Sequence, residues 1–495
     1  MRGHGARIAL GLLGPALLLA APAAAQELDA PPVAEGAPGT NYGAITLGRV
    51  IASVQEHHPK VRAALANERV AEAQLGAARG AFDPYLSVYG ALRHGGYYEL
   101  RRVDAEVRAP TPLWGAEVWA GYRVGQGIEE SRYPTYYDDQ TLDRGELRAG
   151  VRVPLWRDGP LDYRRAGRQQ AEHRRVAARE YREMTELELQ QKATGAYWSW
   201  VAAGQAYAVS EELLELAQQR QAQVERRAEA GAIPPVDALE GRRSLLSRQR
   251  YLVAARRKVE ASALVLGLFL RDEAGDPAPP GLDRLPEVLP TPEPVGDPSA
   301  AFEQVRGCHP SLEAPRAYLE YQRVARDLAR ARRGPQLDVR MQVSRDFGEG
   351  DTSLPGTVYE AGLVFSMPLA LRTARGNLEA AEAEVASQTQ DLRLLEDTLL
   401  TELRDAASAY EAAAERYRIL QELADTTRQL AEAERRRFDA GATSLLVVNM
   451  REQSVGEAAM SVVSAASELW YARARWDALT RCEVAASGGV APAEP

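Results

Sequence analysis

The chain has 495 residues, of which 45% are hydrophobic and 26% charged, and its formal net charge is −9. This composition excludes a low-complexity protein, and two cysteines are too few for a disulfide-rich scaffold. The absence of a basic excess removes the electrostatic footprint that nucleic acid requires, so no nucleic-acid partner is expected.

The N-terminus has the pattern of a secretory signal peptide. Two arginines precede a short apolar run at residues 8–19, and residues 23–25 form a small-residue cleavage site. No cysteine lies near that site, which argues against a lipoprotein anchor. No apolar run of about 18 residues follows residue 25, so the sequence predicts no transmembrane helix. We expect an exported protein, either soluble outside the cytoplasm or held in an outer membrane by a β-barrel.

The sequence contains an internal duplication. Four landmarks recur in the same order: His58-Pro59 as His309-Pro310, Pro84 as Pro335, Pro154-Leu155 as Pro368-Leu369, and Arg227 with Gly231 as Arg437 with Gly441. Each half therefore follows one plan of amphipathic helix, extended segment, very long helix, glycine-marked turn and second helix.

This plan predicts the domain boundaries. They are a signal peptide at 1–25, a flexible segment at 26–43, a first repeat at 44–271, a Pro-rich linker at 272–298, a second repeat at 299–482 and a disordered tail at 483–495. Strands are expected within 84–155 and 335–368, and long helical hairpins at 160–270 and 370–481. The linker holds eight prolines and is predicted to be an extended connector.

Both long helices are predicted from proline-free stretches, and the second also shows a seven-residue repeat. Residues 161–233, if helical, would extend roughly 110 Å at 1.5 Å per residue. The second long helix carries two apolar seams: Leu378, Val385, Leu392, Leu399, Ala406, Ala413 and Leu420 in one, and Leu395, Leu403, Tyr410, Tyr417, Ala424 and Ala431 in the other. A sustained repeat of this period predicts left-handed supercoiling against neighbouring helices.

Glycines mark the ends of the long helices. Gly231 and Gly441 are each followed within a few residues by a new helical pattern, which predicts left-handed helix stops at two hairpin tips. Pro234 and Pro235 stand at the start of the next helix, where a missing N–H does no harm.

The extended segments alternate between apolar and polar residues. Rows of this kind run over residues 118–124, 147–153, 337–343 and 359–367, which predicts strands with one apolar and one polar face. Residues 81–157 also hold 12 aromatic residues, more than twice an even share. They include Tyr97, Tyr98, Trp114, Tyr133, Tyr136, Tyr137 and Trp156 near predicted strand ends. This favours a lipid-facing barrel with aromatic girdles over a soluble β-domain. Its expected polar lining, with Glu146, Arg148, Arg152, Asp338 and Arg340, is of mixed sign and selects no class of cargo.

No catalytic motif or metal-ligand spacing is present in the sequence, so neither an enzyme nor a cofactor or metal is expected. His58 and His309 each precede a proline at a predicted helix start and are interpreted as structural.

The duplicated order, the Ala-Gly hairpin tips and the Pro-Leu junctions resemble the TolC outer-membrane efflux family. The resemblance covers nearly all of residues 44–480 and rests on the ordered set, because no single motif is specific. It implies a mainly α fold in which three copies pool their strands into one membrane β-barrel. Their long helices form an α-barrel tunnel in the periplasm. It also implies contact with outer-membrane lipid and two partners, a periplasmic adaptor (membrane fusion) protein and an inner-membrane pump.

The resemblance implies roles for particular residues. Adaptor docking falls to the hairpin tips and the barrel–tunnel junctions to two prolines: Arg227, Gly231, Arg437 and Gly441 for the tips, and Pro154 and Pro368 for the junctions. Asp237 and Glu240 match acids that ring the family's aperture, although first-turn acids are also favoured by the helix dipole. The second repeat has no acid at the corresponding residues 446–449, which puts an acidic gate there in doubt.

The strands depart from the family plan, and the two cysteines leave two alternatives open. The first extended region is longer than the family plan needs, which favours four strands there and two in the second half, or 18 per trimer rather than 12. Cys308 and Cys482 occupy places that lie near the tunnel's midsection in the family. The alternatives are a disulfide bond and two free buried thiols.

The resulting functional prediction is the outer-membrane exit duct of a tripartite efflux or type I secretion system. Such a duct is a passive conduit for small molecules or proteins, driven by an inner-membrane pump. The alternative is an exported periplasmic coiled-coil structural or adhesion protein without a pore.

Overall fold

The computed structural model describes residues 43–94, 100–127, 140–286, 293–350 and 356–482. The predicted signal peptide, the N-terminal segment and the tail lie outside these ranges, as do the five tyrosines between 97 and 137 named above. Residues from Ala44 onward form one compact unit, which is described here by itself.

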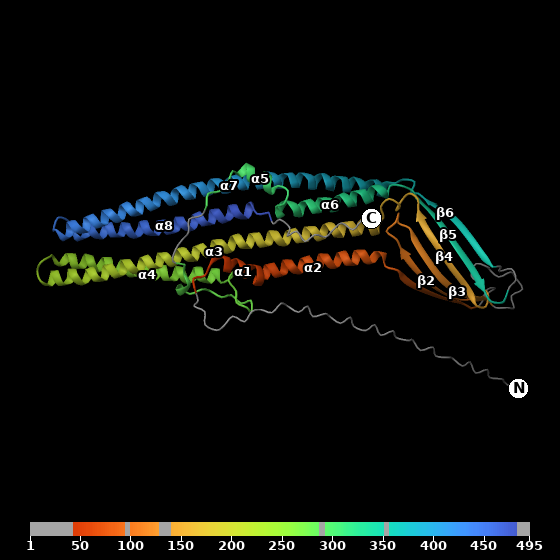
Figure 1. Ribbon diagram of the computed structural model, residues 1–495, viewed down its shortest axis with the longest axis horizontal. Helices are drawn as coiled ribbons and strands as arrows, with labels where there is room; N and C mark the ends of the chain where they lie inside the picture. The colour runs from red at the N-terminus through yellow and green to blue at the C-terminus, as the bar shows by residue number, and fades with distance from the viewer. Residues whose placement is uncertain (1–42, 95–99, 128–139, 287–292, 351–355, 483–495) are drawn as a thin grey trace, which may run out of the picture. The chain divides into compact units, whose positions relative to one another are not determined.

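The two halves of this unit follow the same order of two helices, strands, a long helix and a final helix, so the predicted duplication is confirmed (Figure 1). The first half comprises α1 (Leu47–His57), α2 (Pro59–Arg79), β1 (Tyr85–Arg93), β2 (Leu100–Pro110), β3 (Glu117–Gly127), β4 (Gly145–Pro154), α3 (Tyr163–Glu229) and α4 (Pro235–Leu266). The second comprises α5 (Pro298–Val305), α6 (Pro310–Ala331), β5 (Gln336–Phe347), β6 (Thr357–Ser366), α7 (Arg372–Asp439) and α8 (Leu445–Leu479).

The two histidines of the duplication cap equivalent helices. His58 Nδ1 accepts a hydrogen bond from the Lys60 backbone at the start of α2, and His309 Nδ1 accepts one from Ser311 at the start of α6. A capping acceptor must be unprotonated, and burial lowers the pKa of His309 in keeping with this. The structural interpretation of both residues is therefore confirmed.

The long helices pack laterally along their length. α3 has 67 residues and contacts α2, α4, α6 and α8, whereas α7 has 68 residues and contacts α5, α6 and α8. At 1.5 Å per residue each extends about 100 Å. The predicted seams of α7 are buried or half-buried at every position except Leu395, which is 37% exposed.

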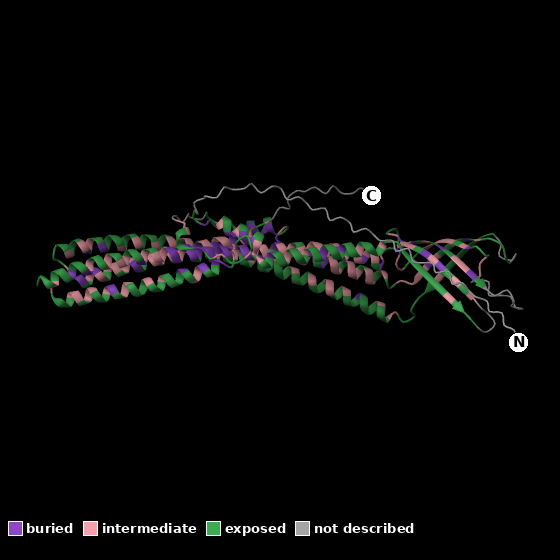
Figure 2. Cartoon of the chain, turned by 90° about the horizontal axis from the view of Figure 1, so that it is seen from below, coloured by how far each residue is buried: buried purple, intermediate pink, exposed green. Residues whose placement is uncertain are grey.

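Burial is concentrated in the middle of the helical region and decreases toward the hairpin tips (Figure 2). One core joins α1, α3 and α4 around the fully buried Trp200. A second core joins α5, α7 and α8 around Leu403 and Phe302. Because α1 and α5 are short amphipathic helices laid against the long ones, they supply the apolar layer that a lone helical pair lacks.

The sequence predicted that the Pro-rich linker is an extended connector, and this prediction is wrong in part. The linker contains a 3₁₀ turn (Leu282–Arg284), and its Leu285 packs against the first core. The Ile45 amide donates to the Arg284 carbonyl over 2.9 Å, and the Tyr410 hydroxyl donates to the Glu293 carbonyl over the same distance. Tertiary contacts of this kind leave no periodic trace in a sequence, which explains why they were missed.

All six strands form one antiparallel sheet in the order β1-β2-β3-β4-β5-β6. The first half supplies four strands and the second two, which confirms the predicted asymmetry. The halves meet where β4 pairs with β5, in a register that runs from Gly145 opposite Phe347 to Pro154 opposite Asp338.

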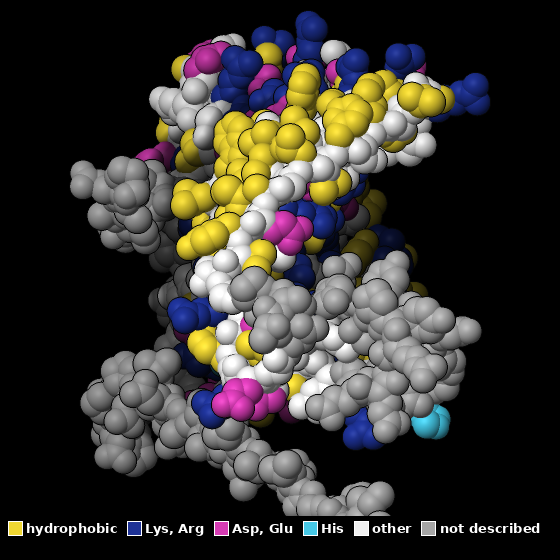
Figure 3. Space-filling view, turned by 90° about the vertical axis from the view of Figure 1, so that its right-hand side faces the viewer, with side chains coloured by type: hydrophobic (Ala, Val, Ile, Leu, Met, Phe, Trp, Pro, Cys, Tyr) yellow, Lys and Arg dark blue, Asp and Glu magenta, His cyan; other side chains and the backbone are white. Residues whose placement is uncertain are grey.

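The strand alternation gives the sheet one apolar face and one charged face. The apolar face is called the outward face here and the charged face the inward face. On the outward face hydrophobic side chains form a broad band (Figure 3). Its most exposed members are Leu86, Val88, Leu92, Val103, Leu147, Tyr359, Leu363 and Phe365, at 52–81% exposure. No helix of the described residues is long and apolar enough to cross a membrane.

Trp200 provides a test of the first core. Trp200→Ala should destabilise the protein by about 3–5 kcal/mol, because truncating a buried aromatic side chain leaves a cavity that its neighbours fill poorly. Thermal unfolding of the purified protein would measure the loss. Tyr181→Ala, at a half-exposed position of the same helix, is the control, and equal shifts for the two variants would contradict this core.

Candidate functional site

The two hairpin tips share one backbone geometry. Gly231 and Gly441 both adopt φ = +74°, the left-handed conformation that favours glycine. At each tip the glycine N–H and the next alanine N–H close two reversed hydrogen bonds, onto Ala228 and Arg227 in one repeat and onto Phe438 and Arg437 in the other. These are Schellman motifs, so the predicted left-handed helix stops are confirmed.

The structure brings the two tips together through side chains. The Arg227 guanidinium carbon lies 5.8 Å from the centre of the Phe438 ring, a cation–π distance. Arg437 instead pairs with Glu434 of its own helix over 3.3 Å. The tips of both repeats therefore form one surface at the end of the helical hairpins.

The two predicted aperture acids lie in the first turns of α4. Asp237 is half-buried, and its amide donates to the Pro234 carbonyl over 3.0 Å. Glu240 pairs with Arg243 over 2.6 Å, and hydrogen bonding to Arg243 holds the pKa of Glu240 below its ordinary value. Glu240 therefore already has a cationic partner within its own helix.

A half-buried carboxylate near the tips was missed by the sequence analysis. Glu452 of α8 accepts hydrogen bonds from Arg220 of α3 and, over 2.7 Å, from Arg435 of α7. Burial alone would raise the pKa of Glu452, but these two arginines reverse the effect and hold the pKa below its ordinary value. Glu452 thus ties the first hairpin to the second.

The inward face of the sheet carries a second charged cluster. Asp104 of β2 accepts hydrogen bonds from Arg102 over 2.5 Å and from Arg123 of β3 over 2.7 Å, with Arg148 of β4 at 3.2 Å. Glu117 contacts Arg164 of α3 at 3.6 Å, which couples the sheet to the long helix. Of the predicted polar lining, Glu146, Arg148, Arg152 and Asp338 form ion pairs, whereas Arg340 forms none among the described residues.

The two junction prolines end strands in both repeats. Pro154 closes β4 and is buried, whereas Pro368 follows β6 and is exposed. Beside Pro154, the completely buried Asp338 pairs with Arg152 over 2.8 Å and accepts a hydrogen bond from Gln336. This pair holds the β4–β5 contact at the point where the strands turn into helices.

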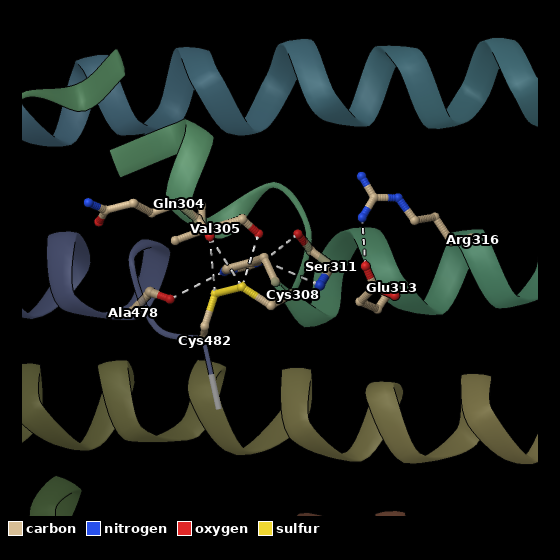
Figure 4. The surroundings of a disulfide bond; sticks show 9 residues. Gln304, Val305, Cys308, Ser311, Glu313, Arg316, Ala478 and Cys482 are labelled. Carbon is tan, nitrogen blue, oxygen red and sulfur yellow. Dashed lines mark hydrogen bonds and ion pairs between the residues drawn. A yellow bond between two sulfur atoms is a disulfide. The ribbon is translucent and has the colours of Figure 1, made fainter. Parts of the chain in front are cut away.

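Cys308 and Cys482 lie together in the structure and are joined by a disulfide bond with a Cα–Cα distance of 5.4 Å (Figure 4). The bond connects the turn between α5 and α6 to the end of α8. Beside the disulfide bond, His309 Nδ1 accepts a hydrogen bond from the Ser311 amide, so the ring proton is on Nε2. Nε2 lies 3.4 Å from the Ala478 carbonyl oxygen, to which it donates. Both contacts attach the end of α8 to the start of α6.

The family model described as "Outer membrane efflux protein" matches residues 131–268 and 301–480, which is more than half of the chain. The chain belongs to the outer membrane efflux protein family. The two matched segments fall in the two repeats on either side of the Pro-rich linker, and the match confirms the resemblance found in the sequence. A comparison with curated proteins found no match.

Solved structures of outer-membrane channels share the fold of this outer membrane efflux protein. The Campylobacter jejuni channel CmeC has 15% identity and a TM-score of 0.61, with 88% of this chain and 85% of that chain covered. The Neisseria gonorrhoeae channel MtrE has 16% identity and a TM-score of 0.61, with 88% of each chain covered. The Vibrio cholerae outer membrane protein VceC has 15% identity and a TM-score of 0.61, with 88% and 96% covered. At these identities the likeness establishes the fold, which confirms the predicted mainly α class with a strand domain.

Among the described residues of this family member, no group of three or more His, Cys, Asp or Glu side chains is arranged to hold a metal ion. The charged clusters at Glu452 and Asp104 are instead neutralised by arginines. Except for Arg102, which shares β2 with Asp104, their partners lie on different elements. Only the heavy use of arginine on the helices and strands could therefore have pointed to them.

Glu452→Gln should destabilise the hairpin region by about 1.5–3 kcal/mol, because the three charge-assisted hydrogen bonds from Arg220 and Arg435 lose their anionic acceptor. Since the folded-state pKa is lowered, the contribution of Glu452 is present above the ordinary glutamate pKa. It is lost as the pH falls through the lowered folded-state value. Thermal unfolding at a series of pH values should show the difference from wild type shrinking in acid.

Glu422→Gln is the matched control, since the Glu422 side chain is 77% exposed and its ion pair with Arg418 is long, at 3.8 Å. It should change stability by less than about 0.5 kcal/mol. Equal effects of the two substitutions, or a Glu452 effect that does not depend on pH, would show that Glu452 and its two arginines do not hold the hairpins together.

Alkylation followed by mass spectrometry tests the cysteine pair. The denatured, unreduced protein should take up no alkylating reagent, and the reduced protein should take up two equivalents. The bond closes a sequence separation of 174 residues, so Cys308→Ser should lower stability by about 2–4 kcal/mol. Two reactive thiols in unreduced protein isolated from its native compartment would rule the bond out.

Proposed function

We propose that three copies of this chain form an outer-membrane exit duct, a passive conduit for small molecules or proteins that an inner-membrane pump drives. The observation that carries the proposal is the six-stranded sheet with an uncovered apolar face and a charged face. A soluble sheet would cover its apolar face with a second layer, whereas lipid leaves it bare.

The sheet has two edges, β1 and β6, that pair with no further strand among the described residues. With six antiparallel strands, these edge strands run in opposite directions. β6 of one copy therefore suits antiparallel pairing with β1 of the next, and three copies would close an 18-stranded barrel. Closure removes every exposed edge, which is a condition for a sheet in hydrocarbon.

The helices favour the same assembly. α4 exposes Leu239, Leu246 and Val253, one every seven residues, at 51–71% exposure. α7 exposes Leu423 and Leu430 at the same spacing. A stripe of this period seeks a neighbouring helix, so contacts between α4 and α7 of adjacent copies would close a homotrimeric tunnel in the periplasm.

The duct proposed here does no chemistry. Most charges on the inward sheet face pair with one another, as Asp104 does with three arginines, so the lining repels neither sign of cargo strongly. Transport would take its energy from the pump. The tips at Gly231 and Gly441 are proposed to dock a periplasmic adaptor through Arg227 and Arg437.

Asp237 and Glu240 are proposed to face the narrow end of the tunnel. In this proposal Glu240 would act there only after Arg243 releases it. Pro154 and Pro368 are proposed to mark the change from barrel to tunnel.

A pair of substitutions on one strand tests the proposal. Leu363 lies on the outward face of β6 and Glu360 on the inward face. Leu363→Arg should prevent membrane assembly, because an arginine facing hydrocarbon costs about 2–4 kcal/mol in each copy. Glu360→Arg should leave assembly intact. Membrane fractionation and heat-modifiable trimer migration are the measurements.

A soluble monomer for the wild type, or equal assembly of both variants, would contradict the duct and favour an exported coiled-coil structural or adhesion protein. Where the duct proposal holds, deletion of the gene followed by drug-susceptibility and secretion assays would separate efflux from protein export. Cross-linking from Arg227 and Arg437 variants carrying a photoreactive residue would identify the adaptor.

A further inference from the structure

Four turns form a continuous row at the end of the sheet that meets the helices. They span residues 111–116, 154–159, 332–335 and 367–371, and are called the junction row here. A Cβ at Gly159 would lie 2.7 Å from the Trp114 indole nitrogen, and one at Gly334 would lie 2.7 Å from Trp156. The Leu155 amide also donates to the Leu337 carbonyl over 2.7 Å, so adjacent turns touch.

The tips of the junction row are apolar and exposed. Leu113 is 76% exposed, Leu155 is 47% exposed and Leu369 is 99% exposed. Trp114 and Trp156, at 52% and 59%, accompany the first two. Exposed tryptophan beside leucine is typical of the boundary between hydrocarbon and water, and these tips continue the apolar outward face of the sheet.

Four exposed arginines flank these tips. Arg332 and Arg333 lie between α6 and β5, and Arg372 and Arg375 lie in the first turn of α7. Among the described residues no acidic side chain forms an ion pair with any of the four. Of the neighbouring acids, Asp327 pairs with Arg326 and Glu382 pairs with Arg330. Glu379, four residues after Arg375 on α7, forms no ion pair among the described residues.

We propose that the junction row binds the headgroups of anionic phospholipids in the leaflet that faces the helices. This inference rests on the proposed membrane insertion of the sheet. The leucine and tryptophan tips enter the leaflet, while the long arginine side chains extend to the phosphate level just below them. An anionic phospholipid matches both the apolar and the basic side chains of this surface. An acidic protein partner would match the arginines but leave Leu369 without an apolar neighbour.

Phospholipid retention tests the inference. The wild-type trimer is reconstituted into vesicles of equal parts phosphatidylethanolamine and phosphatidylglycerol and then extracted with mild detergent. The retained lipids are quantified by mass spectrometry. The test variant is R332Q/R333Q/R372Q/R375Q. The control R242Q/R257Q/R393Q/R404Q removes four exposed arginines of α4 and α7 that form no ion pair among the described residues.

Wild type and control should retain phosphatidylglycerol in preference to phosphatidylethanolamine, and the test variant should lose that preference by at least about fivefold, the effect of one arginine near an anionic surface. High salt should weaken the preference. An equal lipid ratio in the wild type, or equal preference in both variants, would overturn the inference. Vesicle flotation keeps the two proposals apart, since a chain that does not float with vesicles contradicts membrane insertion itself.

Discussion

The pairing of β4 with β5 is the contact on which the rest of the molecule depends. It joins the duplicated halves into a single sheet, and its register places the inward charges of both halves on one face. A slip of one residue would turn every side chain of β5 and β6 to the opposite face. The buried pair between Arg152 and Asp338 opposes such a slip, because Asp338 would lose its partner inside the protein.

The two halves are also joined through their helices, away from the sheet. α3 contacts α6 and α8, so each half packs against the other rather than only against itself. Glu452 then ties the two hairpins near their tips through arginines of α3 and α7. The two arginines hold the pKa of Glu452 below its ordinary value, so a charged contact ties the hairpins at a place outside the apolar cores.

Much of this fold could be predicted because it repeats along the chain. Proline-free stretches predicted α3 and α7, a seven-residue period supported α7, and glycine at a helix end predicted the turns at Gly231 and Gly441. The length of the first extended region predicted its two additional strands. Contacts between residues far apart in sequence were not predictable, since Arg220 and Glu452 are separated by 232 positions and neither breaks the local helical pattern. The linker's Tyr410–Glu293 contact was missed for the same reason.

The central claim is that identical chains close a barrel through the edges β1 and β6. Cysteine cross-linking between these edges tests it most directly, with Tyr89→Cys on β1 combined in turn with single cysteines at each position of β6. The account predicts that a few neighbouring pairings give covalent trimers on non-reducing gels of membrane-extracted protein. Monomers at every pairing, with the protein in the membrane fraction, would contradict it.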